Sequence, residues 1–131
     1  MSAPFTYHEN LSTLPFIKAH GTQNDFVVLI DVDDQLEDLG VLTPGLVAKL
    51  CDRRSGIGGD GFLRVVRANS DNPPGQQRWF MDYRNADGSI AEMCGNGIRV
   101  FAHVLASTEL EAEHEFDVET RAGLKLSLIH I

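Results

Sequence analysis

The sequence predicts an α+β domain in which a curved, mixed or antiparallel sheet wraps around a central apolar helix. Three observations indicate this fold class. About six or seven short segments of the 131 residues have strand-like patterns. Turn signals separate these segments, and the Asp-Gly pair at 87–88 is typical of a hairpin. Helical spacing is found in only two segments, and the one that begins near Cys94 has an apolar face suited to the core.

The first third of the chain predicts two strands and the connections around them. Residues 1–13 have no pattern, so we expect a flexible N-terminus. Residues 14–19 and 26–32 are predicted strands, and the unbroken apolar start of the second indicates burial on both faces. The polar residues 20–25 form the turn between them, and the acidic residues 31–40 are expected to be a loop.

The pair Thr43-Pro44 predicts the start of a helix, since Thr is a good N-cap and Pro is favoured at the first helical position. The helix has one apolar stripe, and Cys51 extends it, so we interpret Cys51 as a core residue. The other residues of the stripe are Leu46, Val47 and Leu50. Four of the next residues, within 55–61, are glycines, which predicts a tight loop.

The rest of the chain predicts further strands around the second helix. The strands are expected at residues 62–68, 78–84, 116–120 and 123–131. Residues 94–97, Cys-Gly-Asn-Gly, open the helix, because apolar side chains then recur with helical spacing. The inward face of that helix is made of Ile98, Phe101, Ala102 and Leu105.

Composition narrows the classes of function. The chain has 19 acidic and 11 basic residues and a net charge of −8, which argues against a general binder of nucleic acid or anionic membranes. No apolar run approaches the ~18–20 residues of a membrane span, and residues 1–10 do not resemble a secretory signal. Two cysteines are too few for a disulfide framework. We therefore expect a cytoplasmic protein.

Cys94 is the most informative residue. A thiol at a helix N-terminus has its thiolate form favoured by unpaired N–H groups and the helix dipole. The neighbouring Gly95 and Gly97 allow a ligand to approach the backbone, whose amides can hold a carboxylate. The alternative is a buried structural cysteine at the start of a core helix. The residues alone leave both interpretations open.

Four segments in this order resemble the N-terminal half of the diaminopimelate epimerase family. The most specific pair is Asn-Ala-Asp-Gly-Ser at 85–89 followed by Cys-Gly-Asn-Gly-Ile-Arg at 94–99. The other two are the turn at 20–26 and the glycine loop at 52–61. The resemblance implies that residues 14–125 form an N-terminal epimerase domain.

The family resemblance also implies a reaction. Members interconvert LL- and meso-diaminopimelate for lysine and peptidoglycan precursor synthesis, without a cofactor, using two cysteines as acid and base. By this resemblance Cys94 is one catalytic cysteine. The backbone of Gly95 and Asn96 holds the reacting carboxylate, and Asn24 and Asn85 bind substrate; the alternative for these two asparagines is a local turn role. Some relatives carry a substrate-binding Gln where this chain has Gly61, so that role is not transferred.

Other kinds of site find little support in the sequence. The five histidines show no metal-ligand spacing, and no lysine lies in a phosphate-binding context that pyridoxal phosphate would need. A thiol hydrolase would need a histidine to pair with Cys94, and none can be assigned. Asp25, Asp60 and Asp87 lie in turns and are interpreted as structural.

The resemblance ends after residue 125. Residues 126–131 match the translation of a common sequencing-adapter end, so we expect a non-native tail. The resemblance implies that the family's C-terminal domain is absent, and with it the second cysteine and the arginine for the distal carboxylate. This chain alone is therefore expected to be inactive. The complete protein is a candidate homodimer. Two alternatives stay open: an epimerase or racemase of the same fold for another amino acid, such as proline or hydroxyproline, and a non-catalytic fragment.

Overall fold

The structure, a computed structural model, forms a seven-stranded mixed sheet in which the strands follow their order in the chain. It describes residues 2–5, 14–21, 24–67, 79–91, 95–111, 115–121 and 123–128. The strands are β1 (Ser2–Phe5), β2 (Leu14–His20), β3 (Asp25–Ile30), β4 (Gly61–Arg67), β5 (Trp79–Asn85), β6 (Glu115–Thr120) and β7 (Gly123–Leu128). The helices are α1 (Gln35–Asp38), α2 (Pro44–Cys51) and α3 (Gly95–Ser107). The parallel pairs are β3 with β4 and β5 with β6, and the other neighbours are antiparallel.

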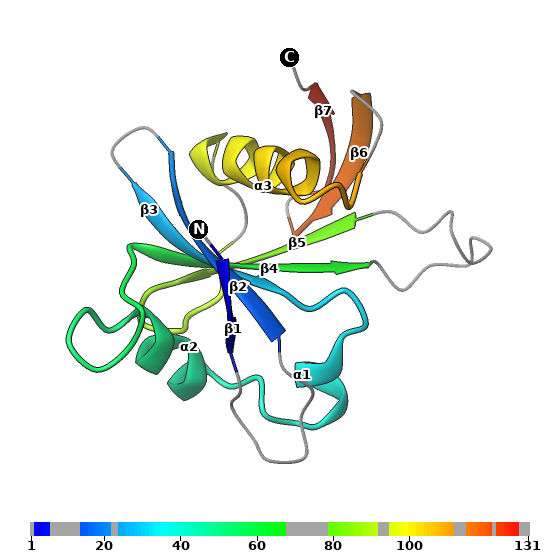
Figure 1. Cartoon of the computed structure of the whole chain (residues 1–131). Helices are drawn as coiled ribbons and strands as arrows, with labels where there is room; N and C mark the ends of the chain where they lie inside the picture. Colours follow the sequence, from blue (N-terminus) through cyan, green and yellow to red (C-terminus); the bar gives the residue numbers. More distant parts are fainter. Residues whose placement is uncertain are drawn as a thin grey trace.

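Helices cover both faces of the sheet, with α3 on one side and α1 and α2 on the other (Figure 1). The central strand β3 shows why. Phe26 and Val28 pack in the cluster that contains the buried side of α3, whereas Val27 and Leu29 pack in the cluster that contains α1 and α2. Alternate side chains of a strand point to opposite faces, so an unbroken apolar run serves both layers. The predicted burial of this strand on both faces is confirmed.

The two predicted helices are also confirmed. Thr43 caps α2, since its hydroxyl accepts a hydrogen bond from the Leu46 backbone N–H at 3.2 Å. Cys51 is buried at the end of α2, with 4% of its surface exposed. The buried side of α3 lies in one apolar cluster with residues of β3, β4, β5 and β6, and the half-buried Ile98 packs against that cluster. The buried residues of α3 include Val100, Phe101, Ala102, Val104 and Leu105. The α+β class and the mixed sheet are therefore confirmed.

Two predictions about irregular segments were wrong. Ser2–Phe5 forms β1, paired with β2, within the segment expected to be flexible; residues 6–13 lie outside the described residues. Gln35–Asp38 forms the short helix α1 within the expected loop. The Asp31 carboxylate accepts hydrogen bonds from the N–H groups of Gln35 (2.8 Å) and Leu36 (3.1 Å) at its start. The strand β1 depends on pairing with β2, and α1 depends on hydrogen bonds to Asp31. Neither has a local apolar repeat, so the periodicity of the sequence did not predict them.

The predicted strand at 123–131 is confirmed through Leu128, where β7 pairs with β6, and residues 129–131 lie outside the described part. Residues of native or non-native origin can form a strand if they tolerate an extended backbone. The pairing of β7 therefore does not test the non-native origin of residues 126–131, which stays a prediction. Among the described residues, no helix has the length and apolar character needed to cross a membrane.

A buried ionic cluster lies beneath β4 and β5, on the side of α1. The Asp82 carboxylate is fully buried and accepts hydrogen bonds from Arg64 Nε (2.8 Å), Arg84 Nε (3.1 Å) and Arg121 Nη2 (2.6 Å). Arg64 Nη1 also lies 3.0 Å from an oxygen of the buried Asp31. Burial by itself raises the pKa of Asp82, but the hydrogen bonds and charges of the arginines outweigh it and lower the pKa below its ordinary value.

Candidate active site

The asparagines Asn24 and Asn85, singled out in the sequence, lie at the same end of three neighbouring strands, which is called the sheet edge below. Strands β3 and β4 begin there and β5 ends there, because Phe26, Gly61 and Asn85 are aligned across the three strands. Tyr83 of β5 packs in the α3 cluster, so by the period of two along the strand Asn85 lies on the α3 side as well. Adjacent strands are ~4.8 Å apart, which separates β3 from β5 by about 10 Å.

The first turn of α3 is at the same edge. Gly21, at the end of β2, packs directly under Asn96: a Cβ built on Gly21 would lie 3.3 Å from Asn96 Cβ and 3.2 Å from Val100 Cγ2. A side chain at residue 21 would push α3 away from the sheet, so glycine permits the approach. Gly21 N–H donates to the Asn24 carbonyl at 2.8 Å, which joins Asn24 to this contact.

Asn24 is half-buried, and its side chain has no hydrogen-bond partner among the described residues. Its position is held by the next residue. Asp25 and Asp60 exchange hydrogen bonds, because each carboxylate accepts from the other's backbone N–H at 3.1 Å. Arg53 bridges the two carboxylates, with Nη2 2.8 Å from Asp25 and 3.1 Å from Asp60. The glycine loop is thereby tied to the turn that carries Asn24.

These contacts confirm that Asp25 and Asp60 have structural roles. The hydrogen bonds from Arg53 have the largest effect on Asp25 and, with the Lys18 ammonium 3.0 Å away, hold the pKa of Asp25 far below its ordinary value. A carboxylate with such a low pKa is a poor proton acceptor at neutral pH. Asp25 is therefore unsuited to be a catalytic base.

Asn85 ends β5 and opens a tight turn. Its Nδ2 donates to Ser89 Oγ at 2.9 Å, so the local turn role considered for this residue is present in the structure. Asp87 accepts from Ser89 N–H at 2.9 Å, which confirms its structural interpretation. Gly88 has a φ of +89°, and a Cβ there would collide with the Pro44 backbone. The turn is thus pressed against the start of α2, which restricts where Asn85 can lie.

Gly95 is the first residue of α3 and is exposed, and Asn96 is half-buried in the first turn. The first N–H groups of a helix have no partner within the helix and can bind an anion. Cys94 lies outside the described residues. Its catalytic role therefore stays a prediction, which rests on its place in the chain directly before Gly95.

Gly61, to which no substrate-binding role was transferred, lies beside two aromatic rings. A Cβ on Gly61 would lie 3.1 Å from Tyr83 Cε1 and 3.2 Å from Phe26 Cδ1. The two rings pack edge to face with centroids 6.2 Å apart. In this chain the aromatic pair fills the space beside residue 61.

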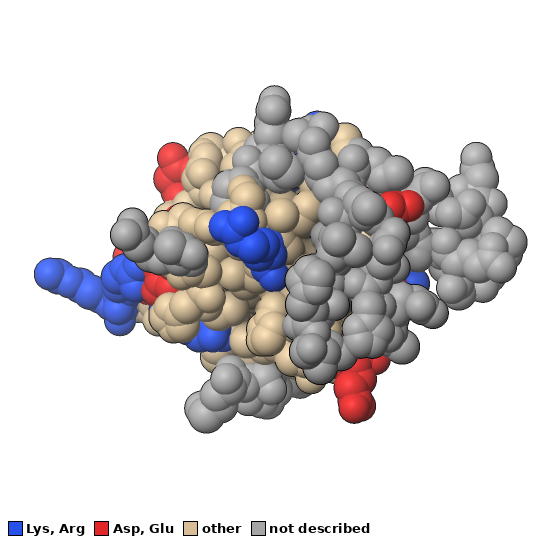
Figure 2. Space-filling model, turned by 90° about the horizontal axis from the view of Figure 1, so that it is seen from above, with Lys and Arg blue, Asp and Glu red and all other residues tan. Residues whose placement is uncertain are grey.

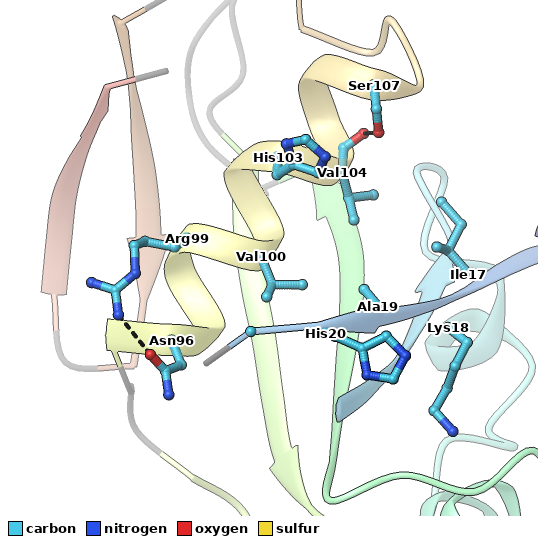
Figure 3. Close-up of a pocket in the computed structure, with 11 residues that line it drawn as sticks. Ile17, Lys18, Ala19, His20, Asn96, Arg99, Val100, His103, Val104 and Ser107 are labelled. Carbon is cyan, nitrogen blue, oxygen red and sulfur yellow. Dashed lines mark hydrogen bonds between the residues drawn. The ribbon is translucent and has the colours of Figure 1, made fainter. Parts of the chain in front are cut away.

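A cavity of about 590 Å³ lies between β2 and α3 (Figure 3). Asn96 lines it together with Arg99 and His103 of α3 and with Lys18 and His20 of β2. Asn24, Asn85 and Gly95 do not line it.

The described surface seen from above carries its Lys and Arg side chains in separate groups, with acidic side chains beside some of them (Figure 2). The described residues contain no group of three His, Cys, Asp or Glu side chains arranged for a metal ion.

Three residues of this region were missed or left without a role in the sequence analysis. Arg53 bridges Asp25 and Asp60, Gly21 supports Asn96, and Arg99 bonds to Asn96. The i, i+3 spacing of Asn96 and Arg99 on a predicted helix was the one local signal for these contacts. The other contacts join segments that are distant in the chain.

The two cysteines are expected to differ in reactivity. Burial raises the pKa of the Cys51 thiol to about 11, so it is protonated and covered at neutral pH. The start of a helix favours the thiolate of Cys94. At about pH 7.5 iodoacetamide should therefore label Cys94 about tenfold faster than Cys51 or more. Peptide mass spectrometry over time measures both rates, and labelling in urea provides the control, because unfolding should make the rates similar. Equal rates in the native protein would contradict the helix-start effect.

Comparison with known proteins identifies relatives over nearly the whole chain. The family model described as diaminopimelate epimerase matches residues 16–131. A curated diaminopimelate epimerase from Corynebacterium glutamicum is 55% identical over 115 residues, which is 86% of this chain and 40% of that protein. The one from Rhodococcus erythropolis is 50% identical over 130 residues, covering 92% of this chain and 43% of the relative. The chain thus spans less than half the length of these curated relatives.

Proposed function

Because the chain belongs to the diaminopimelate epimerase family, we propose that it supplies one side of the active site of an amino-acid epimerase. The substrate of the complete protein is LL-diaminopimelate, its product is meso-diaminopimelate, and the reaction serves lysine and peptidoglycan precursor synthesis in the cytoplasm. The observation that supports this most directly is the family match together with the gathering of Asn24, Asn85 and the first turn of α3 at one sheet edge.

The chemical problem is the weak acidity of the substrate's α-hydrogen. In this proposal the Cys94 thiolate takes that proton, and the electron pair left on Cα spreads into the neighbouring carboxylate. Backbone N–H groups of Gly95 and Asn96 donate to this carboxylate, where the positive end of α3 lowers the energy of the added charge. No pyridoxal phosphate is needed, since the helix start stabilises the carbanion.

Inversion requires a second acid on the other side of Cα. A cysteine in the part of the protein beyond this chain delivers the proton there, so the substrate keeps its place while its configuration changes. Asn24 and Asn85 orient the rest of the substrate from the sheet edge. The 131-residue chain by itself lacks the second acid and has no turnover.

The packing of α3 in this chain supports the proposed role of its first turn. One apolar cluster joins α3 to strands β3–β6, including Trp79 of β5 and Val118 of β6. We propose that the sheet curves around α3 as a central helix. The curved sheet would fix the helix start relative to the strand ends that carry the asparagines.

A hybrid protein tests the function. Residues 16–125 of this chain replace the matching segment of the Corynebacterium glutamicum relative, and the hybrid is incubated with LL-diaminopimelate in deuterated water. The expected results are formation of the meso isomer and deuterium at the α-carbon, measured by NMR and mass spectrometry. L-Proline and hydroxyproline should show neither change.

The controls separate the alternatives. The 131-residue chain alone should give no exchange, whereas turnover would mean that two copies rebuild the site. Exchange of proline instead of diaminopimelate would favour another racemase of the fold. A folded hybrid without activity on any of the substrates would overturn the proposal in favour of a non-catalytic fragment.

A further inference from the structure

Arg99 lies one helical turn after Asn96 and points back to it. Its Nη2 donates to Asn96 Oδ1 at 2.6 Å (Figure 3). Arg99 is exposed at the rim of the cavity between β2 and α3. Among the described residues, no carboxylate lies within ion-pair distance of its guanidinium. The guanidinium is therefore directed at a neutral amide, which is a different use from the arginines that surround Asp82.

The bond determines which way the Asn96 amide faces. A guanidinium only donates hydrogen bonds, so the atom of Asn96 that meets it must be the acceptor oxygen. Turning the amide by half a rotation would place two donors against each other. The Nδ2 group is consequently turned away from Arg99, as Figure 3 shows.

A second contact restricts the same side chain from the opposite direction. Gly21 packs under Asn96 so closely that a Cβ on the glycine would lie 3.3 Å from Asn96 Cβ. Val100, one turn further along α3, is buried and keeps this turn of the helix against the sheet. Gly21 limits where the Cβ of Asn96 can lie, and the hydrogen bond to Arg99 restricts rotation of the amide.

We propose that Arg99 is a positioning residue: it orients the Asn96 side chain so that Nδ2 donates to a carboxylate of the substrate bound at the start of α3. The proposal rests on the proposed function and adds the Asn96 side chain to the backbone contacts described above. Arg99 acts through Asn96 and does not touch the substrate.

Kinetics of the hybrid protein test this role. Arg99→Met keeps much of the side-chain length but has no donor, and it should raise KM for LL-diaminopimelate about tenfold while kcat changes about twofold or less. Arg99→Lys should recover part of the loss. His103→Gln alters an exposed residue of α3 that lines the same cavity, and it should leave both constants unchanged.

A double-mutant cycle separates positioning from direct binding. If Arg99 works through Asn96, then Arg99→Met should have no further effect on KM in an Asn96→Ala background. Equal effects in both backgrounds would overturn the proposal, as would an unchanged KM in an active hybrid. An inactive parent hybrid would instead count against the proposed function.

The bond itself can be measured without activity. In ¹⁵N NMR spectra of the 131-residue chain, Arg99→Met should shift the side-chain amide signals of Asn96, whereas His103→Gln should not. Unchanged Asn96 signals would overturn the positioning role even if the hybrid were inactive.

Discussion

Replacing Cys94 with alanine in the hybrid protein is expected to slow epimerisation of LL-diaminopimelate by on the order of 10²–10⁴-fold. The thiolate is the proposed base on one side of the α-carbon, and alanine can neither accept nor return the proton. Exchange of the α-hydrogen with deuterated water should fall with the formation of the meso isomer. Both are measured in the same reaction by NMR and mass spectrometry.

Two variants make this result specific. Cys94→Ser keeps a similar volume but carries a much weaker acid, so it should also lose most of the activity. Cys51→Ala removes the other cysteine of this chain, which is buried in the core beside α2 and has a pKa of about 11, so it should retain activity. Full activity of Cys94→Ala would refute the assignment of Cys94 as a catalytic base.

Asp82→Asn is expected to lower the free energy of unfolding by about 3–5 kcal/mol. The aspartate is fully buried and is shared by Arg64, Arg84 and Arg121, so neutralising it removes the counter-charge that these three arginines have in common, although Arg64 keeps its ion pairs with Asp31 and Asp34. Urea unfolding of the 131-residue chain measures the loss. Trp79 reports it by fluorescence, since it is the one tryptophan of the sequence and is 2% exposed.

Asp33→Asn is the matched control, because it makes the same change at an exposed residue near the cluster. It should alter stability by about 0.5 kcal/mol or less. Acid provides a second check. The pKa of Asp82 is lower in the folded state, so its stabilisation is present above the unfolded pKa of ~3.9 and is lost as the pH falls below about 4. Equal losses in Asp82→Asn and Asp33→Asn would contradict a role of the cluster in stability.

Local patterns predicted those elements whose side chains repeat with a period. The run at 26–30, the capped helix after Thr43 and the apolar face from Ile98 onward all lie where the sequence indicated. The strand β1 and the short helix α1 did not follow from such patterns. The first is held by pairing with β2, and the second begins on hydrogen bonds to Asp31. Neither partner can be recognised from the spacing of the segment itself.

The ionic cluster is a similar case. Along the chain Arg64, Asp82 and Arg121 are ordinary charged residues of strands and turns, and alternation in β5 would allow Asp82 to face water. The antiparallel register of β4 and β5 places Arg64 directly opposite Asp82, and α1 covers the same face. Burial then makes the pairing of these charges obligatory, because an isolated charge in the interior is costly.

The sequence by itself determined the family, the apolar framework and the residues to inspect, among them Cys94, Asn96 and the two asparagines of the turns. These follow from motifs and periods that are complete within short segments. The tertiary structure alone decided that Asn24 and Asn85 share one sheet edge and that Gly21 lies under Asn96. The strand register and the position of α3 on the sheet depend on contacts between segments that are distant in the chain. The residue spacing within a short segment cannot predict the free energy of such contacts.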